Sequence, residues 1–98
     1  MTLLELFQAV KDEKLDKQSL EAYHSQLSSL KAQMHLELAD IEKAEATFIY
    51  NSEIETDIGK KRAWKASEKG QRQITLDAYI KATSTVLSSL KNRLFSVY

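Results

Sequence analysis

Apolar residues recur every three or four positions along most of the chain, the spacing of helices with one buried face. At the start, Thr2 is followed three residues later by Glu5, the form of a helix capping box. The apolar positions that come next share one helical face: Leu3, Leu6, Phe7 and Val10. We therefore predict a short first helix of about ten residues that ends near Asp12 to Lys14.

A much longer helix is predicted from Asp16, an N-cap candidate, to about Tyr50. Leu15 and Leu20 are placed to form a hydrophobic staple across this cap. The apolar positions of the helix alternate three and four residues apart, with one interruption at Glu37. They are Leu20, Tyr23, Leu27, Leu30, Met34, Ile41, Ala44 and Phe48.

Residues 51–57 carry the strongest signal for a break in the helical pattern. Ser52 with Glu55 is one capping box, and Thr56 or Asp57 is a competing N-cap. The sequence leaves open whether this segment is a true turn or a kink in a continuous helix.

A second long helix is predicted from about Asp57 to Phe95. Its seam consists of Leu76, Ile80, Thr83, Leu87, Leu90, Leu94 and Val97. Gly70 lies inside this helix, where glycine costs about 1 kcal/mol relative to alanine. Either a backbone or a ligand approaches closely at Gly70, or the helix tolerates the cost.

With no proline and two glycines, most of the chain can be helical. The predicted fold class is all-α: one domain, residues 1–98, in which a short N-terminal helix precedes a coiled-coil-like hairpin of two long helices. In such a hairpin, one partner helix covers the apolar seam of the second long helix poorly, so we expect a homo-oligomer. The expected oligomer seam is Leu76, Ile80, Leu87, Leu90 and Leu94.

Composition narrows the protein class. The 98 residues include no cysteine, so disulfides and thiolate metal sites are excluded. No run of 18 apolar residues is present, and the first residues lack the basic region of a secretory signal. We expect a cytoplasmic protein with no membrane partner.

Charge is divided unevenly along the chain. Residues 1–57 hold five basic and twelve acidic residues, a net charge of −7, whereas residues 58–98 hold nine basic and two acidic residues, a net charge of +7. An asymmetry of this size bears on partners and assembly more than on the fold.

The densest basic stretch suggests a nucleic-acid site. In one continuous helix, Arg62, Lys65, Lys69 and Arg72 form a stripe that can follow a phosphate backbone. Trp64 lies beside the stripe, where its ring could stack on an unpaired base. The predicted nucleic-acid-binding residues are Lys60, Lys61, Arg62, Trp64, Lys65, Lys69 and Arg72.

Two other interpretations of the basic stretch remain open. It could pair with the acidic segment of the same or another subunit, through residues such as Glu42 and Glu45. It could also be a solvated helix face whose Trp64 packs against a neighbouring helix.

The sequence offers little support for catalysis or metal binding. Glu21 and His24 have the Glu-x-x-His spacing of di-iron bundles, but His35 lacks the matching glutamate. The acidic residues Glu37, Asp40, Glu42 and Glu45 lie on a bare helix, which favours a solvated face over a cation site. We expect no catalytic residue, no metal and no cofactor.

Two segments have a recognisable sequence: residues 30–52 read LKAQMHLELADIEKAEATFIYNS, and residues 86–95 read VLSSLKNRLF. The first is similar to the long helix of phage recombination mediators of the UvsY type, and the second is similar to their C-terminal segment. More broadly, RAWK at residues 62–65 with GQR at 70–72 resembles small helical phage proteins. This chain is shorter and carries its basic cluster after the turn.

The resemblance implies a non-enzymatic, phage-type protein in the bacterial host cell. Such mediators bind single-stranded DNA, form ring-like oligomers through their C-terminal helices, and help to load a recombinase. The predicted function is therefore binding of single-stranded nucleic acid to assist recombination or replication. The alternative is a protein–protein interaction or assembly factor, such as a phage scaffold or an inhibitor of a host protein, without nucleic-acid contact.

Overall fold

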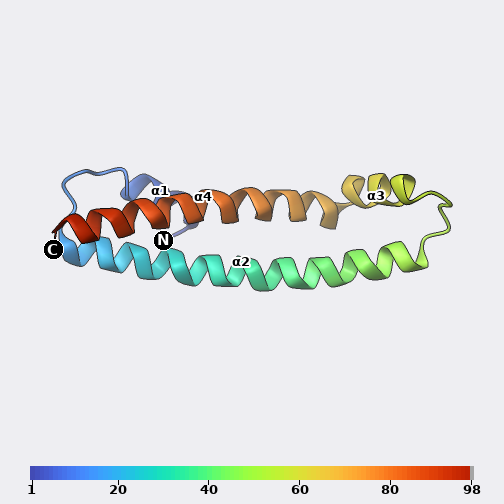
Figure 1. Cartoon of the computed structure of the whole chain (residues 1–98), viewed down its shortest axis with the longest axis horizontal. Helices are drawn as coiled ribbons and strands as arrows, with labels where there is room; N and C mark the ends of the chain where they lie inside the picture. The colour runs from blue at the N-terminus through green and yellow to red at the C-terminus, as the bar shows by residue number, and fades with distance from the viewer. Residues whose placement is uncertain (98) are drawn as a thin grey trace. The chain divides into compact units, whose positions relative to one another are not determined.

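The computed structural model describes residues 1–97, with the side chain of Val97 excluded. These residues form four helices and no strand (Figure 1): α1 Leu3–Ala9, α2 Lys17–Asn51, α3 Asp57–Ala66 and α4 Glu68–Val97. The all-α prediction is confirmed. The chain divides into two compact units, unit 1 with Met1–Gln33 and the chain from Ile80 onward, and unit 2 with Met34–Tyr79.

The predicted capping box begins α1. The Thr2 hydroxyl accepts a hydrogen bond from the Glu5 amide, and the Thr2 amide donates to the Glu5 carboxylate, both at 3.2 Å. The helix ends at Ala9, earlier than predicted. Its end is closed by Arg93 of α4, which donates to the carbonyls of Val10 at 2.8 Å and Asp12 at 2.6 Å.

Helix α2 begins at the predicted cap and ends in a true turn. The Asp16 carboxylate accepts from the Ser19 amide at 2.8 Å. After Asn51 the chain leaves the helix, and Thr56 caps α3 by accepting from the Gly59 amide at 3.0 Å. The open question over residues 51–57 is therefore settled in favour of a turn with Thr56 as the cap.

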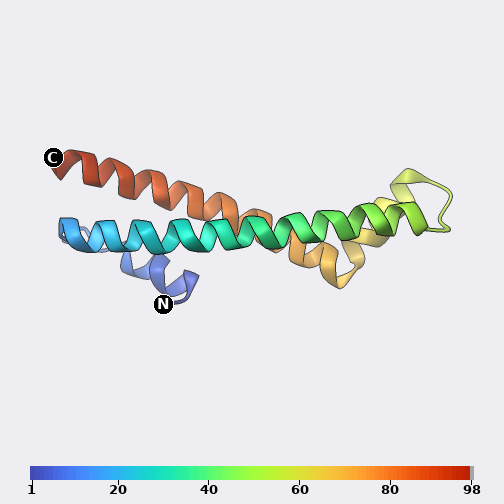
Figure 2. The ribbon, with the colours of Figure 1, turned by 90° about the horizontal axis from the view of Figure 1, so that it is seen from below.

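The core of unit 1 is built from three helices, and in Figure 2 α1 (blue) and α4 (red) lie on either side of α2. Leu6 of α1, Leu20 and Leu27 of α2, and Leu90 of α4 form one buried cluster. Leu15 packs against this cluster. The fit of α1 to α2 and α4 supplies the apolar cover that a two-helix hairpin lacks.

The residues of the predicted oligomer seam are buried or partly buried by packing within the chain. Leu90 is buried in unit 1, where Leu87 and Leu94 pack around it, and Leu76 is buried in unit 2. Ile80 is partly buried. In unit 1, helix α1 adds apolar cover to the part of the seam around Leu90. The homo-oligomer stays a prediction. The Val97 side chain of the longer seam lies outside the described residues.

Unit 2 has its own core, made by α2, α3 and α4. Ile41, Trp64 and Leu76 are buried there, and Phe48 packs against them. Within this unit the later residues of α2 contact earlier residues of the returning chain, so the helices run antiparallel. The acidic part of α2 thus lies beside the basic stretch, and unit 2 carries seven basic and nine acidic residues, a net charge of −2.

Candidate nucleic-acid interface

The predicted single helix from Asp57 to Phe95 is interrupted at Ser67, inside the basic stretch. Ser67 has extended backbone angles, φ −74° and ψ 159°, and separates α3 from α4. Its amide donates to the Trp64 carbonyl, and its hydroxyl accepts from the Gly70 amide at 3.1 Å. Ser67 thus ends one helix and caps the next.

The structure answers the question about Gly70. This residue is buried in the first turn of α4. A β-carbon there would lie 1.9 Å from the Trp64 carbonyl oxygen. Gly70 is therefore a point of close backbone approach, and the sharp bend at Ser67 depends on it.

Trp64 is a core residue and does not present its ring for stacking on a base. Its side chain is 5% exposed, and its ring packs against Phe48 with centroids 5.6 Å apart at a tilt of 54°. The indole Nε1 donates to Gln73 at 2.7 Å, and Gln73 donates to Glu45 at 3.1 Å. The predicted stacking role is corrected, because the apolar ring is buried against α2 and its one donor is satisfied.

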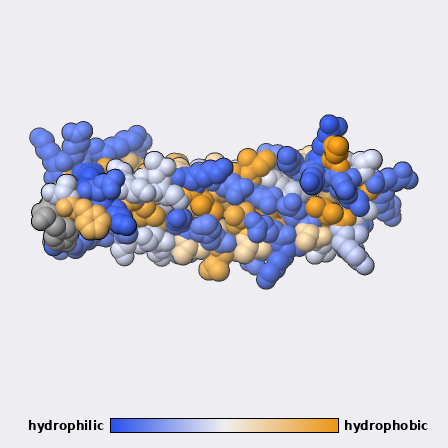
Figure 3. Space-filling model, viewed as in Figure 1, coloured by the Kyte–Doolittle hydropathy of each residue, from blue (hydrophilic) through white to orange (hydrophobic). Residues whose placement is uncertain are grey.

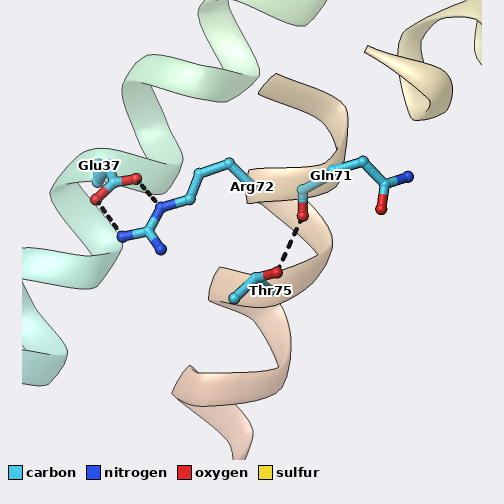
Figure 4. Close-up of polar contacts among 4 residues, drawn as sticks. All are labelled: Glu37, Gln71, Arg72 and Thr75. Atoms are coloured by element: carbon cyan, nitrogen blue, oxygen red, sulfur yellow. Dashed lines mark hydrogen bonds and ion pairs between the residues drawn. The ribbon is translucent and has the colours of Figure 1, made fainter. Parts of the chain in front are cut away.

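Arg72 is paired within the chain (Figure 4). Its Nε donates to Glu37 Oε2 at 2.6 Å, and its Nη2 donates to Glu37 Oε1 at 3.0 Å. These hydrogen bonds lower the pKa of the Glu37 carboxyl and raise the pKa of the Arg72 guanidinium. For Arg72, the interpretation as a charge partner of the acidic segment fits better than that of a free phosphate contact.

The neutral donors of the basic stretch also have partners in the chain. The side-chain amide of Gln71 donates to the Lys65 carbonyl at 2.6 Å, which closes the last turn of α3. The main-chain carbonyl of Gln71 accepts from the Thr75 hydroxyl at 3.2 Å (Figure 4). Sequence reasoning missed that Gln71 and Gln73 secure the bend. No local pattern identifies these contacts, because they depend on the backbone turning at Ser67.

The remaining basic residues are available at the surface. Lys61, Arg62, Lys65 and Lys69 are exposed, whereas Lys60 is partly buried. Among the residues that the structure describes, none of these five forms an ion pair. Ile58, Lys61, Arg62 and Lys65 follow the spacing of a single helix face. This face lies to one side of the buried Trp64, and Lys61 and Lys65 line a pocket together with it.

The break at Ser67 divides the predicted stripe. Lys61 and Lys65 line a pocket of about 260 Å³ that also includes Glu45 and Asp77. Lys69 lines a different pocket, with Glu37 and Arg72. The structure thus keeps Lys61, Arg62 and Lys65 together on α3 and separates them from Lys69 and Arg72. We call Lys61, Arg62 and Lys65 the α3 basic face.

Two further findings bear on the function class. In the part of the chain that is described, no group of three or more His, Asp or Glu side chains is arranged to hold a metal ion. No described helix is both long and apolar enough to cross a membrane.

Comparisons with protein families, curated proteins and solved structures found no match to this chain.

Proposed function

We propose that this protein binds nucleic acid, in its single-stranded form, through the α3 basic face. The observation that carries the proposal is the grouping of Lys61, Arg62 and Lys65 on one exposed face, where none of them forms an ion pair with a described residue. Together with Lys60 and Asp57, they give the ten residues of α3 a net charge of +3. A positive surface of this kind attracts phosphates without regard to base sequence.

The bend between α3 and α4 supports a single strand as the ligand. Lys65 lies on α3 and Lys69 on α4, on the two sides of the bend at Ser67, so a strand that contacts both must follow that bend. A flexible single strand can do so, whereas the phosphates of a duplex are fixed by the double helix. With Trp64 buried, the affinity should come from phosphate contacts and not from base stacking.

The resemblance to recombination mediators gives this binding a context. The proposed role is non-enzymatic: the protein covers single-stranded nucleic acid and assists a recombination or replication machinery. A recombinase is the protein partner that the resemblance implies.

A titration of labelled single-stranded DNA, duplex DNA and RNA at several salt concentrations tests the proposal. We expect the single strand to bind most tightly, with a slope of about 0.7 in log affinity against log salt for each phosphate neutralised. Replacing Lys61 and Lys65 with glutamine should weaken binding and lower the slope by about one to two units. Lys11→Gln with Lys14→Gln, exposed lysines outside α3, is the matched control.

The alternative, an interaction or assembly factor, rests on a groove in unit 1. This groove between α1 and α4 has a volume of about 710 Å³ and includes Leu4, Phe7 and Val86 in its lining. The net charge of −2 on unit 2 also favours this alternative, since it opposes nonspecific attraction of nucleic acid. If the unmodified protein binds none of the three nucleic acids even at low salt, the nucleic-acid proposal is wrong and this alternative becomes the better one.

A further inference from the structure

A small polar pocket within unit 2 borders the α3 basic face. Lys61 and Lys65 form one part of its lining, and the carboxylates of Glu45 and Asp77 form another. Among the described residues, neither lysine forms an ion pair with either carboxylate. The pocket therefore offers a ligand both positive charge and hydrogen-bond acceptors.

The Glu45 side chain is held in place by two hydrogen bonds in series. The Trp64 indole is only a donor, so its bond to Gln73 at 2.7 Å fixes the side-chain oxygen of Gln73 toward Trp64. The amide nitrogen of Gln73 then faces Glu45 and donates to its Oε2 at 3.1 Å. No donor of the described residues bonds the other oxygen, Oε1. A partly buried acceptor is thus positioned at the pocket in advance of any ligand.

The pocket has the size and the apolar surface for one base. Its volume of about 260 Å³ is below the roughly 300–1,000 Å³ of pockets that enclose whole small-molecule ligands. Ile74, which is 50% exposed, gives the lining an apolar surface. In the space-filling view, the surface around α3 is mostly hydrophilic, with small hydrophobic areas between the polar side chains (Figure 3). A base has the same combination, an apolar ring face and a polar edge.

We propose that this pocket binds an unpaired guanine of the nucleic-acid strand, an inference that rests on the proposed function. Guanine has two neighbouring donors on its Watson–Crick edge, the N1–H and the N2 amino group, whereas each other base has one donor group there. A carboxylate can accept both donors of guanine, and the bond from Gln73 leaves lone pairs of Glu45 for them. Glu45 accepts from the base in this arrangement, while Lys61 and Lys65 contact the adjacent phosphates.

The same chemistry favours a single strand over a duplex. In a duplex the two donors of guanine are paired with cytosine, so they are not available to a protein carboxylate. The phosphate contacts of the α3 basic face set the overall affinity, and the pocket at Glu45 adds a preference at one base.

Fluorescence anisotropy with short single strands of thymidine that differ at one central base tests the proposal. We expect the strand with one guanine to bind at least about fivefold more tightly than the all-thymidine strand. Inosine lacks the N2 amino group, so a strand with inosine in place of guanine should lose most of this preference. This comparison uses the unmodified protein and does not depend on the folding of a variant.

Glu45→Gln should remove the preference for guanine, because an amide has one acceptor oxygen where the carboxylate has two. Glu42→Gln is the matched control, the same change at an exposed glutamate of α2 that does not line this pocket. Both variants raise the net charge by one, so a general electrostatic gain in affinity is common to them. We expect equal affinities of the two variants for the all-thymidine strand and a guanine preference only in Glu42→Gln.

The outcomes separate this inference from the proposed function. Equal binding of the guanine and all-thymidine strands by the unmodified protein would overturn the guanine pocket and leave the proposed function standing. A guanine preference that Glu45→Gln retains would also overturn the pocket. Absence of binding to every strand would overturn the proposed function, and this inference with it.

Discussion

Gly70 and Trp64 are in backbone contact across the bend at Ser67, so close that residue 70 has no room for a β-carbon. The contact is to a carbonyl of the main chain, which cannot move aside as a flexible side chain can. The bend therefore places a steric condition on the sequence that outweighs helix propensity.

Gly70→Ala should destabilise the protein by about 1–3 kcal/mol, the usual cost of overpacking, although alanine is the better helix former by about 1 kcal/mol. Chemical denaturation followed by circular dichroism measures the change. Gly59→Ala is the comparison: its added carbon would meet side-chain atoms of Ile54 and Thr56 at 2.8 Å, one of them the hydroxyl that caps α3. We expect a smaller loss there, since a side chain can rotate and a main-chain carbonyl cannot. A stabilising effect of Gly70→Ala would contradict the contact.

Trp64→Phe should lower stability and leave nucleic-acid affinity unchanged. Phenylalanine retains a ring against Phe48 but leaves Gln73 without its donor, a loss of about 1–3 kcal/mol when a partner is left unsatisfied. Denaturation and a DNA titration on the same variant separate the two effects. Weaker DNA binding by a fully folded Trp64→Phe protein would restore the stacking role that the structure argues against.

The Arg72–Glu37 pair should make stability depend on pH. Its hydrogen bonds lower the pKa of Glu37 in the folded chain, so their contribution is present above the unfolded pKa. It is lost as the pH falls through the lowered folded pKa. Because both side chains are nearly half exposed, the contribution should be about 0.2–1 kcal/mol.

Urea denaturation at neutral pH and at a pH below the folded pKa of Glu37 checks this expectation. Arg72→Gln should reduce the difference in stability between the two conditions. Arg62→Gln, which removes an exposed arginine that has no ion pair in the described part of the chain, should leave this difference unchanged. Equal behaviour of the two variants would mean that the pair contributes nothing.

Arg93→Gln should loosen α1. The guanidinium donates to two carbonyls beyond the end of that helix, and hydrogen bonds from charged groups contribute about 1.5–3 kcal/mol. The substitution should accelerate hydrogen exchange at the amides of residues 6–10 more than at the amides of α2. Lys81→Gln, an exposed lysine of α4, should not change the exchange.

Local sequence patterns predicted the starts of α1 and α2, because each of these starts depends on neighbouring residues. The Thr2 and Glu5 box and the Asp16 cap were found from spacing alone. The bend at Ser67 was missed, since serine followed by Glu-Lys-Gly reads equally well inside a helix. What decides it is the contact of Gly70 with the Trp64 carbonyl, which no periodicity reveals.

The candidate site was predicted only in part for a related reason. The charges of the basic stretch are apparent in the sequence, but which of them stay free depends on the antiparallel return of the chain. Arg72 meets Glu37, which is 35 residues earlier, while Lys61 and Lys65 form no ion pair within residues 1–96. The burial of Trp64 follows from Phe48, whose place opposite Trp64 is set by the turn between α2 and α3.

The division of the chain into two units has a consequence for the order in which it folds. Unit 2 is one continuous stretch, residues 34–79, closed by a short turn, so its contacts are local and can form early. Unit 1 joins the first 33 residues to those from Ile80 onward, and Leu6 must meet Leu90. During synthesis the apolar face of α1 therefore stays without its partner in α4 until the last helix has left the ribosome.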